Sequence, residues 1–241
     1  MTDAAPKVVV MYVYPALGGD HDVLAAKFAS TYMRYRPTTP HELRVVANGG
    51  SPTPKMLETF RNVRAVWLEH DDSGWDIGAY RKAAREVPCD LMVFFGGSAY
   101  LRGTRWLERM IEAWKKHGRA IYGSMGSLAH NPHIRTTGFW MPPDLLNAYP
   151  HPTTSEKVSR YAFEHGRNGL TMWVLSQNLK AWVVTWTAEY EHPQWNTIPN
   201  GYHRGDQSAL ITGDRLIDPP YYRRTARPVL AQPVLTRTRP R

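Results

Sequence analysis

The segment from Ala65 to Phe95 constrains the fold of this chain more than any other. A short apolar run, Ala65–Leu68, precedes a turn rich in glycine and aspartate, and a helix-like run, Tyr80–Val87, leads at once to a second apolar run, Leu91–Phe95. This order predicts a βαβ unit, which requires parallel strands. The turn would then lie at the carboxyl edge of a sheet, where backbone N–H groups and a carboxylate can face a ligand.

Asp76 is the acidic residue of that turn that we consider the strongest candidate for ligand binding. A side chain here can bind a ligand at the edge of the sheet. Asp72, Ser73 or Asp76 can equally serve as the N-cap of the following helix, because all three residue types accept hydrogen bonds from helix amides. The spacing alone leaves both interpretations open.

The rest of the chain alternates strands and helices in the same way. The run from Lys7 to Tyr14 is continuously apolar, as in strands buried on both faces of a mostly parallel sheet. An amphipathic helix is expected from about Asp22 to Tyr35. Further strands are expected at residues 43–47, 63–68, 91–95, 119–123, 138–141 and 181–186. The predicted fold class is therefore α/β, with a mostly parallel central sheet flanked by helices.

Composition narrows the functional classes. The 241 residues fit one domain, and no apolar stretch approaches the length of a membrane span. The first seven residues lack the basic and apolar regions of a signal peptide. Cys89 is the single cysteine, which excludes an intrachain disulfide and suits a reducing cytosol. These features predict a cytoplasmic protein in which Cys89 is a buried structural thiol.

The chain is basic, with a formal charge of +9 and an isoelectric point of about 9.7. This charge favours anionic partners such as nucleotide phosphates, nucleic acid or anionic polymers. Residues 223–241 contain arginines and prolines but no acidic residue, which predicts a basic C-terminal tail. The dinucleotide signature G-x-G-x-x-G and the P-loop signature are both absent, and the histidines lack the spacing of a zinc motif.

Four segments in order give the chain a resemblance to a known family. They are the strand from Val8 to Tyr14, the turn from Gly74 to Tyr80, the run from Leu91 to Tyr100 followed by Trp106-Leu107, and a C-terminal set formed by Phe163–Gly166, Leu170-Thr171 and Gly205–Gln207. Together they resemble nucleotide-sugar glycosyltransferases of the GT-A fold, in particular the group around the rhamnan synthesis protein F family. The resemblance covers about residues 8–210.

The resemblance implies a domain over residues 1–222, with a nucleotide-sugar half at about 1–123 and an acceptor half at 124–222. It implies transfer of a sugar from a nucleotide-sugar donor to a hydroxyl acceptor. The donor-binding residues expected from it are Tyr12, Tyr14, Asp72, Gly74, Asp76, Gly96, Gly97 and Ser98. Core packing for the tyrosines is the alternative.

One departure from the family concerns the metal. Most GT-A enzymes carry Asp-x-Asp after the fourth strand, and its carboxylates hold Mn²⁺ or Mg²⁺ against the diphosphate. Here the sequence is Gly96-Gly97-Ser98, and glycine offers no side-chain oxygen to a hard cation. We therefore expect no metal site of the usual kind and favour a metal-independent enzyme. The alternatives are an ion held by another carboxylate, such as Asp206, and a degenerate site. The glycines would also let the backbone approach the sugar-phosphate.

Glycosyl transfer needs further groups that the sequence suggests. A departing diphosphate needs positive charge, for which Arg102, His203 and Arg204 are candidates. An inverting enzyme needs a base that takes the acceptor's proton, and Asp206 is preferred to Glu164 because it lies in a polar turn. A helix cap is the alternative for Asp206.

Aromatic residues in the second half suggest where an acceptor would lie. Trp186 and Trp195 flank an irregular segment and are candidate platforms for a sugar ring. The rival to the enzyme is a non-enzymatic basic domain that binds nucleic acid. A combination of the two is a glycosyltransferase that acts on a polyanion, such as a surface polymer or modified DNA.

Overall fold

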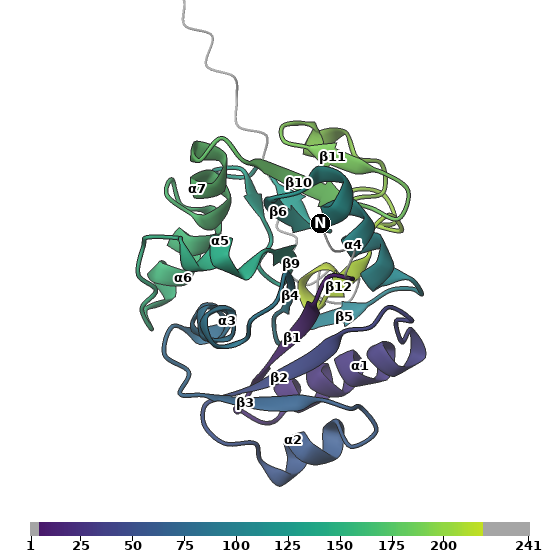
Figure 1. The fold of residues 1–241 in the computed structure, drawn as a ribbon, viewed down its shortest axis with the longest axis vertical. Helices are drawn as coiled ribbons and strands as arrows, with labels where there is room; N and C mark the ends of the chain where they lie inside the picture. The colour runs from purple at the N-terminus through teal and green to yellow at the C-terminus, as the bar shows by residue number, and fades with distance from the viewer. Residues whose placement is uncertain (1–4, 219–241) are drawn as a thin grey trace, which may run out of the picture.

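The structure, a computed structural model, describes residues 5–218, so the predicted basic tail at 223–241 lies outside the described residues. Its centre is a sheet of eight strands in the order β11-β10-β6-β9-β4-β1-β2-β3 (Figure 1). In that order the strands are β11 (Glu189–Glu191), β10 (Lys180–Val184), β6 (Ala120–Gly123), β9 (Gly138–Met141), β4 (Leu91–Phe95), β1 (Val8–Pro15), β2 (Glu42–Asn48) and β3 (Val66–His70).

The pairing directions confirm the α/β class with a mostly parallel sheet. β1 pairs in parallel with β2 and β4, β2 with β3, and β6 with β10. β9 is antiparallel to both of its neighbours, β4 and β6, and β11 is antiparallel to β10. The parallel group β4-β1-β2-β3 therefore ends at one common edge, and the loops that leave these four strands meet there.

Helices cover both faces of the sheet. α1 (Asp20–Arg34), α2 (Pro54–Thr59) and α4 (Trp106–His117) pack on one face. α3 (Trp75–Glu86), α5 (Pro143–Asn147), α6 (Lys157–His165) and α7 (Leu170–Ser176) pack on the other. In Figure 1, α3, α5, α6 and α7 lie to the left of the sheet. No helix within residues 5–218 has the length and apolarity needed to cross a membrane.

Strand β1 shows why the sheet has two covered faces. Every residue from Val8 to Pro15 is buried. Tyr12 and Tyr14 belong to the core under α1 and α2. Met11 and Val13, which alternate with them along the strand, belong to the core under α3. Alternate side chains of a strand point to opposite faces, so a strand in the middle of such a sheet is apolar throughout.

Two small sheets complete the described part of the chain. β12 (Thr212–Asp214) pairs antiparallel with β5 (Ala99–Leu101), which places Asp214 opposite Ala99. β7 (Gly126–Ser127) pairs with β8 (His133–Ile134), and short 3-10 turns occupy Gln194–Thr197 and Arg215–Ile217. The pairing of β12 with β5 brings the late part of the chain to the loop that follows β4.

Candidate functional site

A pocket of about 610 Å³ lies where the loops after β1, β2, β3 and β4 meet. Acidic and basic residues both line it. The acidic residues are Asp72, Asp76, Glu164 and Asp214, and the basic ones are Arg135, Lys157, Arg160 and Arg215, with His21 and His165. A pocket of this volume is in the range that binds a small organic ligand.

The turn before α3 has the form expected of a ligand-binding turn. Asp72, Gly74 and Trp75 all have positive φ angles, of 67°, 76° and 58°. The N-cap residue of α3 is Gly74, and no side chain forms a cap hydrogen bond. The N-cap interpretation of Asp72, Ser73 and Asp76 is therefore wrong. The tight left-handed turn instead leaves Asp72 and Asp76 in the pocket lining.

Asp76 lies in the first turn of α3, and its carboxyl group has a pKa above the usual value. Burial raises its pKa to about 6, and the nearby Asp72 carboxylate adds to this effect. The Arg160 guanidinium and the Gly97 backbone N–H act in the opposite direction. A carboxyl group with such a pKa can both release and take up a proton near neutral pH. Asp72 has a raised pKa for the same main reason, while a hydrogen bond from the Asn48 side chain lowers it.

Gly96 and Gly97 follow β4, and Gly97 lines the pocket. A Cβ on Gly97 would lie 2.8 Å from Pro15 Cδ, and one on Gly96 would lie 2.9 Å from the Tyr80 hydroxyl oxygen and 3.1 Å from Asp76 Oδ2. Tyr12 donates a hydrogen bond of 2.9 Å to the Gly97 carbonyl from behind the wall. Close packing therefore accounts for both glycines, and Tyr12 positions the wall from within the core.

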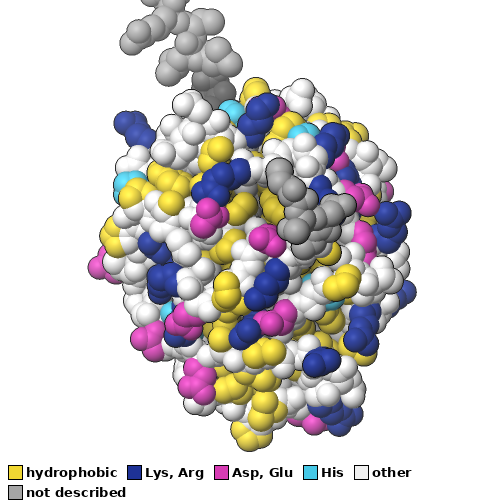
Figure 2. Space-filling model, viewed as in Figure 1, with side chains coloured by type: hydrophobic (Ala, Val, Ile, Leu, Met, Phe, Trp, Pro, Cys, Tyr) yellow, Lys and Arg dark blue, Asp and Glu magenta, His cyan; other side chains and the backbone are white. Residues whose placement is uncertain are grey.

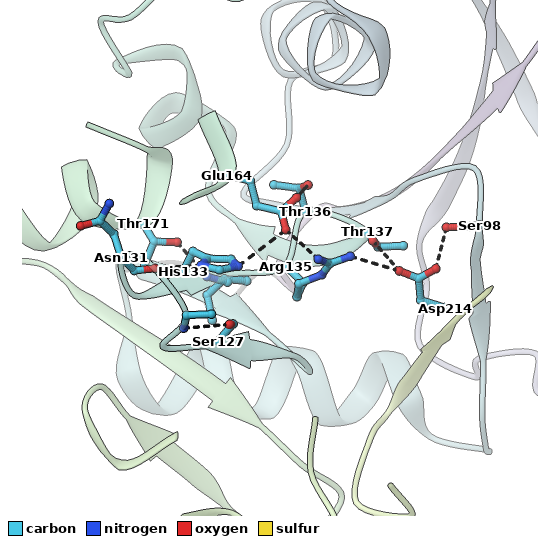
Figure 3. Close-up of polar contacts among 12 residues, drawn as sticks. Ser98, Ser127, Asn131, His133, Arg135, Thr136, Thr137, Glu164, Thr171 and Asp214 are labelled. Carbon is cyan, nitrogen blue, oxygen red and sulfur yellow. Dashed lines mark hydrogen bonds and ion pairs between the residues drawn. The ribbon is translucent and has the colours of Figure 1, made fainter. Parts of the chain in front are cut away.

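Ser98 meets a carboxylate that sequence reasoning missed. Asp214 in β12 is 1% exposed and accepts hydrogen bonds from Ser98 Oγ at 2.8 Å and Thr137 Oγ1 at 2.9 Å (Figure 3). All three residues line the pocket. No local sequence pattern marks Asp214, because its place depends on the pairing of β12 with β5.

Arg135 lies between two carboxylates (Figure 3). Its Nη1 is 3.1 Å from Glu164 Oε1, and its Nη2 is 3.6 Å from Asp214 Oδ2. Burial opposes the charge on Arg135, but Glu164 and Asp214 are among the groups that outweigh burial and raise its pKa. Glu164 also accepts a hydrogen bond from Thr136 Oγ1 at 2.7 Å. The sequence prediction of Glu164 thus identified a pocket residue but missed the arginine beside it.

Ten of the fifteen predicted site residues do not line this pocket, among them all of the predicted catalytic and phosphate-stabilising residues except Glu164. Asp206 is exposed and accepts a hydrogen bond of 2.9 Å from the Ser208 backbone N–H, which lowers its pKa. The segment after Asp206 is a turn, so the predicted helix cap at Asp206 is absent. His203 and Arg204 are exposed in the same irregular segment, and Arg102 is partly exposed. The lysine and arginine side chains of the pocket come from α6, the β8–β9 loop and the turn after β12 instead.

The aromatic residues are also placed differently from expectation. Trp195 is 4% exposed, and its indole N–H donates to the Tyr190 carbonyl at 3.0 Å. Trp186 packs against the core and Gly103, and Tyr14 donates to Asp22 on the α1 side. The exposed aromatic rings of the pocket are Trp75 and Tyr161, at 37% and 42% exposure.

The carboxylates of Asp214 and Glu164 in this pocket contact hydroxyl groups and a guanidinium. Across residues 5–218, no group of three or more histidine, cysteine, aspartate or glutamate side chains is arranged to hold a metal ion. Both oxygens of Asp214 already accept hydrogen bonds from hydroxyl groups, and a guanidinium lies between Asp214 and Glu164.

Known proteins of similar structure were compared with this chain. No protein-family model matches it, and no curated protein matches it in sequence, so membership of the rhamnan synthesis protein F group stays a prediction. Similar structures include a mannosyltransferase from Pyrobaculum calidifontis in complex with GDP-mannose and Mn²⁺ (14% identity, TM-score 0.48). Others are a CMP-2-keto-3-deoxy-manno-octonic acid synthetase with CTP (9%, 0.47) and mouse xyloside xylosyltransferase 1 (8%, 0.49).

The alignments cover 63%, 73% and 71% of this chain, and 49%, 88% and 82% of the three proteins. The chain thus spans about half the length of the mannosyltransferase. With identities of 8–14% and TM-scores below 0.5, these likenesses identify neither a substrate nor a site residue in this chain.

Proposed function

We propose that this protein is a glycosyltransferase that moves a sugar from a nucleotide-sugar donor to a hydroxyl acceptor. The observation that carries the proposal is the pocket at the carboxyl edge of the parallel strands, with acidic groups on the β3–α3 turn and basic groups on α6. A nucleotide sugar presents hydroxyl groups and a diphosphate. Carboxylates accept hydrogen bonds from hydroxyl groups, and lysine and arginine bind phosphate.

The positions of the acidic and basic side chains determine the orientation that we propose for the donor. Asp72 and Asp76 would bind hydroxyl groups of the nucleoside or the sugar, while Lys157 and Arg160 would lie toward the diphosphate. The Arg160 guanidinium carbon is 5.7 Å from the centre of the Trp75 ring, so the aromatic ring and the basic group form one surface. Trp75 and Tyr161 are then the rings available to stack on a base or a sugar.

Glu164 is the better placed of the two predicted bases. It lines the pocket, whereas Asp206 lies in an exposed turn elsewhere. Arg135 Nη1 lies 3.1 Å from Glu164 Oε1, and a carboxylate can accept a proton from an acceptor hydroxyl. We therefore assign the role of base to Glu164 in an inverting reaction, independent of a divalent metal.

A panel of UDP-, GDP-, TDP- and CMP-sugars, scored by the rise in melting temperature, tests the proposal. A ligand that binds only the folded state raises the melting temperature. We expect one nucleotide family to stabilise the protein and to be hydrolysed slowly or transferred. The Asp72→Asn variant should lose this response.

The same panel tests the rival function of nucleic-acid binding. Nucleic-acid proteins usually carry a basic stripe on one face. On the face shown in Figure 2, basic and acidic side chains are interspersed. Stabilisation by an oligonucleotide with a steep salt dependence, and by no nucleotide sugar, would replace the enzyme proposal with the rival.

A further inference from the structure

The carboxylate at the end of β4 comes from a distant part of the chain. Residues 96–98 stand where a metal-dependent relative would carry two aspartates, and here only Ser98 has a polar side chain. Ser98 holds Asp214 of β12 through a hydrogen bond of 2.8 Å. Residues 96–98 include no acidic side chain, but the fold brings the carboxylate of Asp214 next to them.

A second carboxylate, Glu164 of α6, faces the same place from the other side. Two carboxylates of this kind would ordinarily need a cation between them, because like charges at a partly buried site repel. Arg135 supplies that cation. It contacts Glu164 at 3.1 Å and Asp214 at 3.6 Å, and the side chains of Arg135 and Glu164 are only 18% and 14% exposed.

We propose that Arg135 is a built-in replacement for the exchangeable divalent cation, held between Glu164 and Asp214 and directed at the donor's diphosphate. This inference rests on the proposed function, because it assigns a role in donor binding. A guanidinium carries five N–H donors in a plane and binds phosphate oxygens in pairs, so it can hold two carboxylates and still offer donors to a ligand. Lys157 and Arg160 supply the remaining charge that the diphosphate needs.

The charge on Arg135 is permanent in this setting. Glu164 and Asp214 raise its pKa despite burial, so the guanidinium stays protonated throughout the working range of pH. A metal ion, in contrast, would exchange with solvent and chelators. Diphosphate binding should therefore need Arg135 and be indifferent to EDTA.

Isothermal titration with inorganic pyrophosphate tests this without a choice of base or sugar. The wild-type protein should bind pyrophosphate equally well with and without EDTA. Arg135→Gln should weaken binding by about tenfold or more, the scale of a lost charge-assisted interaction, and Arg135→Lys should retain part of it. Arg109→Gln is the matched control, because Arg109 is 14% exposed and paired with Glu189 outside the pocket.

A second titration uses Mn²⁺ alone. Removal of the guanidinium leaves Glu164 and Asp214 without the cation between them, so Arg135→Gln should bind Mn²⁺ more tightly than the wild type does. The additional change Asp214→Asn should abolish that gain. Lys at position 135 keeps a positive charge, so Arg135→Lys should show no gain and provides a folded comparison if the glutamine variant is unstable.

Three results would overturn the inference. They are loss of wild-type pyrophosphate binding in EDTA, unchanged pyrophosphate affinity in Arg135→Gln, and no gain of Mn²⁺ affinity in that variant. If the proposed function fails, the experiments should give a different set of results. In that case the pyrophosphate and Mn²⁺ results would hold while no nucleotide sugar stabilises the protein.

Discussion

The hydroxyl of Ser98 donates a hydrogen bond to Asp214 Oδ1 at 2.8 Å across 116 positions of sequence. This hydrogen bond connects the loop after β4 to strand β12, and both residues line the pocket. Because Asp214 is 1% exposed, its charge depends on such donors in place of water.

Ser98→Ala should therefore destabilise the fold. Hydrogen bonds to charged groups contribute about 1.5–3 kcal/mol, and the free energy of unfolding should fall by an amount in this range. Urea denaturation at pH 7 measures it. Ser176→Ala is a suitable control, since the Ser176 hydroxyl is exposed and donates to a backbone carbonyl. An equal, small loss in both variants would contradict the role given to Ser98.

Asp76→Asn should make the protein more stable at neutral pH and weaken donor binding. The folded pKa of Asp76 is about 6, above the unfolded value near 3.9. Stability from its protonated form is therefore full below about pH 4 and is lost as the pH rises toward 6. Asparagine never ionises, so its advantage over the wild type should grow over that interval, to roughly 3 kcal/mol at pH 7.

Urea denaturation of both proteins between pH 4.5 and 7.5 measures this difference for Asp76. The donor identified in the panel should bind about tenfold or more weakly to Asp76→Asn, because the charged acceptor of a hydrogen bond is lost. A stability difference that does not change with pH would show that Asp76 is not the buried acid described above.

Glu164→Gln should reduce turnover by about 10² or more, the scale expected for loss of a general base. Asp206→Asn should have turnover close to wild type, since Asp206 is exposed outside the pocket. Transfer or slow donor hydrolysis provides the assay, with donor affinity measured separately. The reverse pattern would restore Asp206 to the role that the sequence suggested.

Trp75→Phe should abolish most of the fluorescence change caused by a bound nucleotide. Trp75 is 37% exposed at the pocket, while Trp186 lies against the core. Titration of the wild type, Trp75→Phe and Trp186→Phe with the preferred nucleotide separates the two. A response lost only in Trp186→Phe would place the ligand on the other side of the molecule.

Cys89 should resist alkylation in the folded protein. Burial raises its pKa to about 12, so very little of the reactive thiolate exists at pH 8. Iodoacetamide should react at least about 10²-fold more slowly than with a free thiol of ordinary pKa. Modification in 6–8 M urea, where the chain is unfolded, should proceed at the ordinary rate. The Cys89 side chain is only partly buried, so the sequence-based expectation of a fully buried thiol is too strong. Fast labelling of the native protein would contradict its role as an unreactive, structural thiol.

The sequence predicted features that depend on neighbouring residues. The β3–α3 turn, the burial of β1 and the parallel group β4-β1-β2-β3 all follow from local patterns of apolar and turn residues. The direction of β9 did not, because an apolar run has the same pattern in either direction. Arg135 and Asp214 were missed for a related reason, since their roles arise from contacts between strands that meet only in the folded chain.

The preference for Asp206 shows what a local pattern does not contain. A polar turn with a glycine looks suited to a ligand, but nothing in the local pattern reveals which side of the molecule the turn faces. Glu164 was ranked lower because an acid near the end of a helix was expected to be harder to direct at a ligand than one in a polar turn. In the structure, Glu164 lines the pocket, and Arg135 Nη1 is 3.1 Å from its Oε1.

The position of β12 affects how the protein is made. The wall formed by β1, the β3–α3 turn and the β4 loop is complete in the first hundred residues, whereas Asp214 emerges from the ribosome more than a hundred residues later. Chains fold from the N-terminus during synthesis. A nascent chain can therefore form the parallel group β4-β1-β2-β3 before it has a finished pocket, because Asp214 is synthesised after both Arg135 and Glu164.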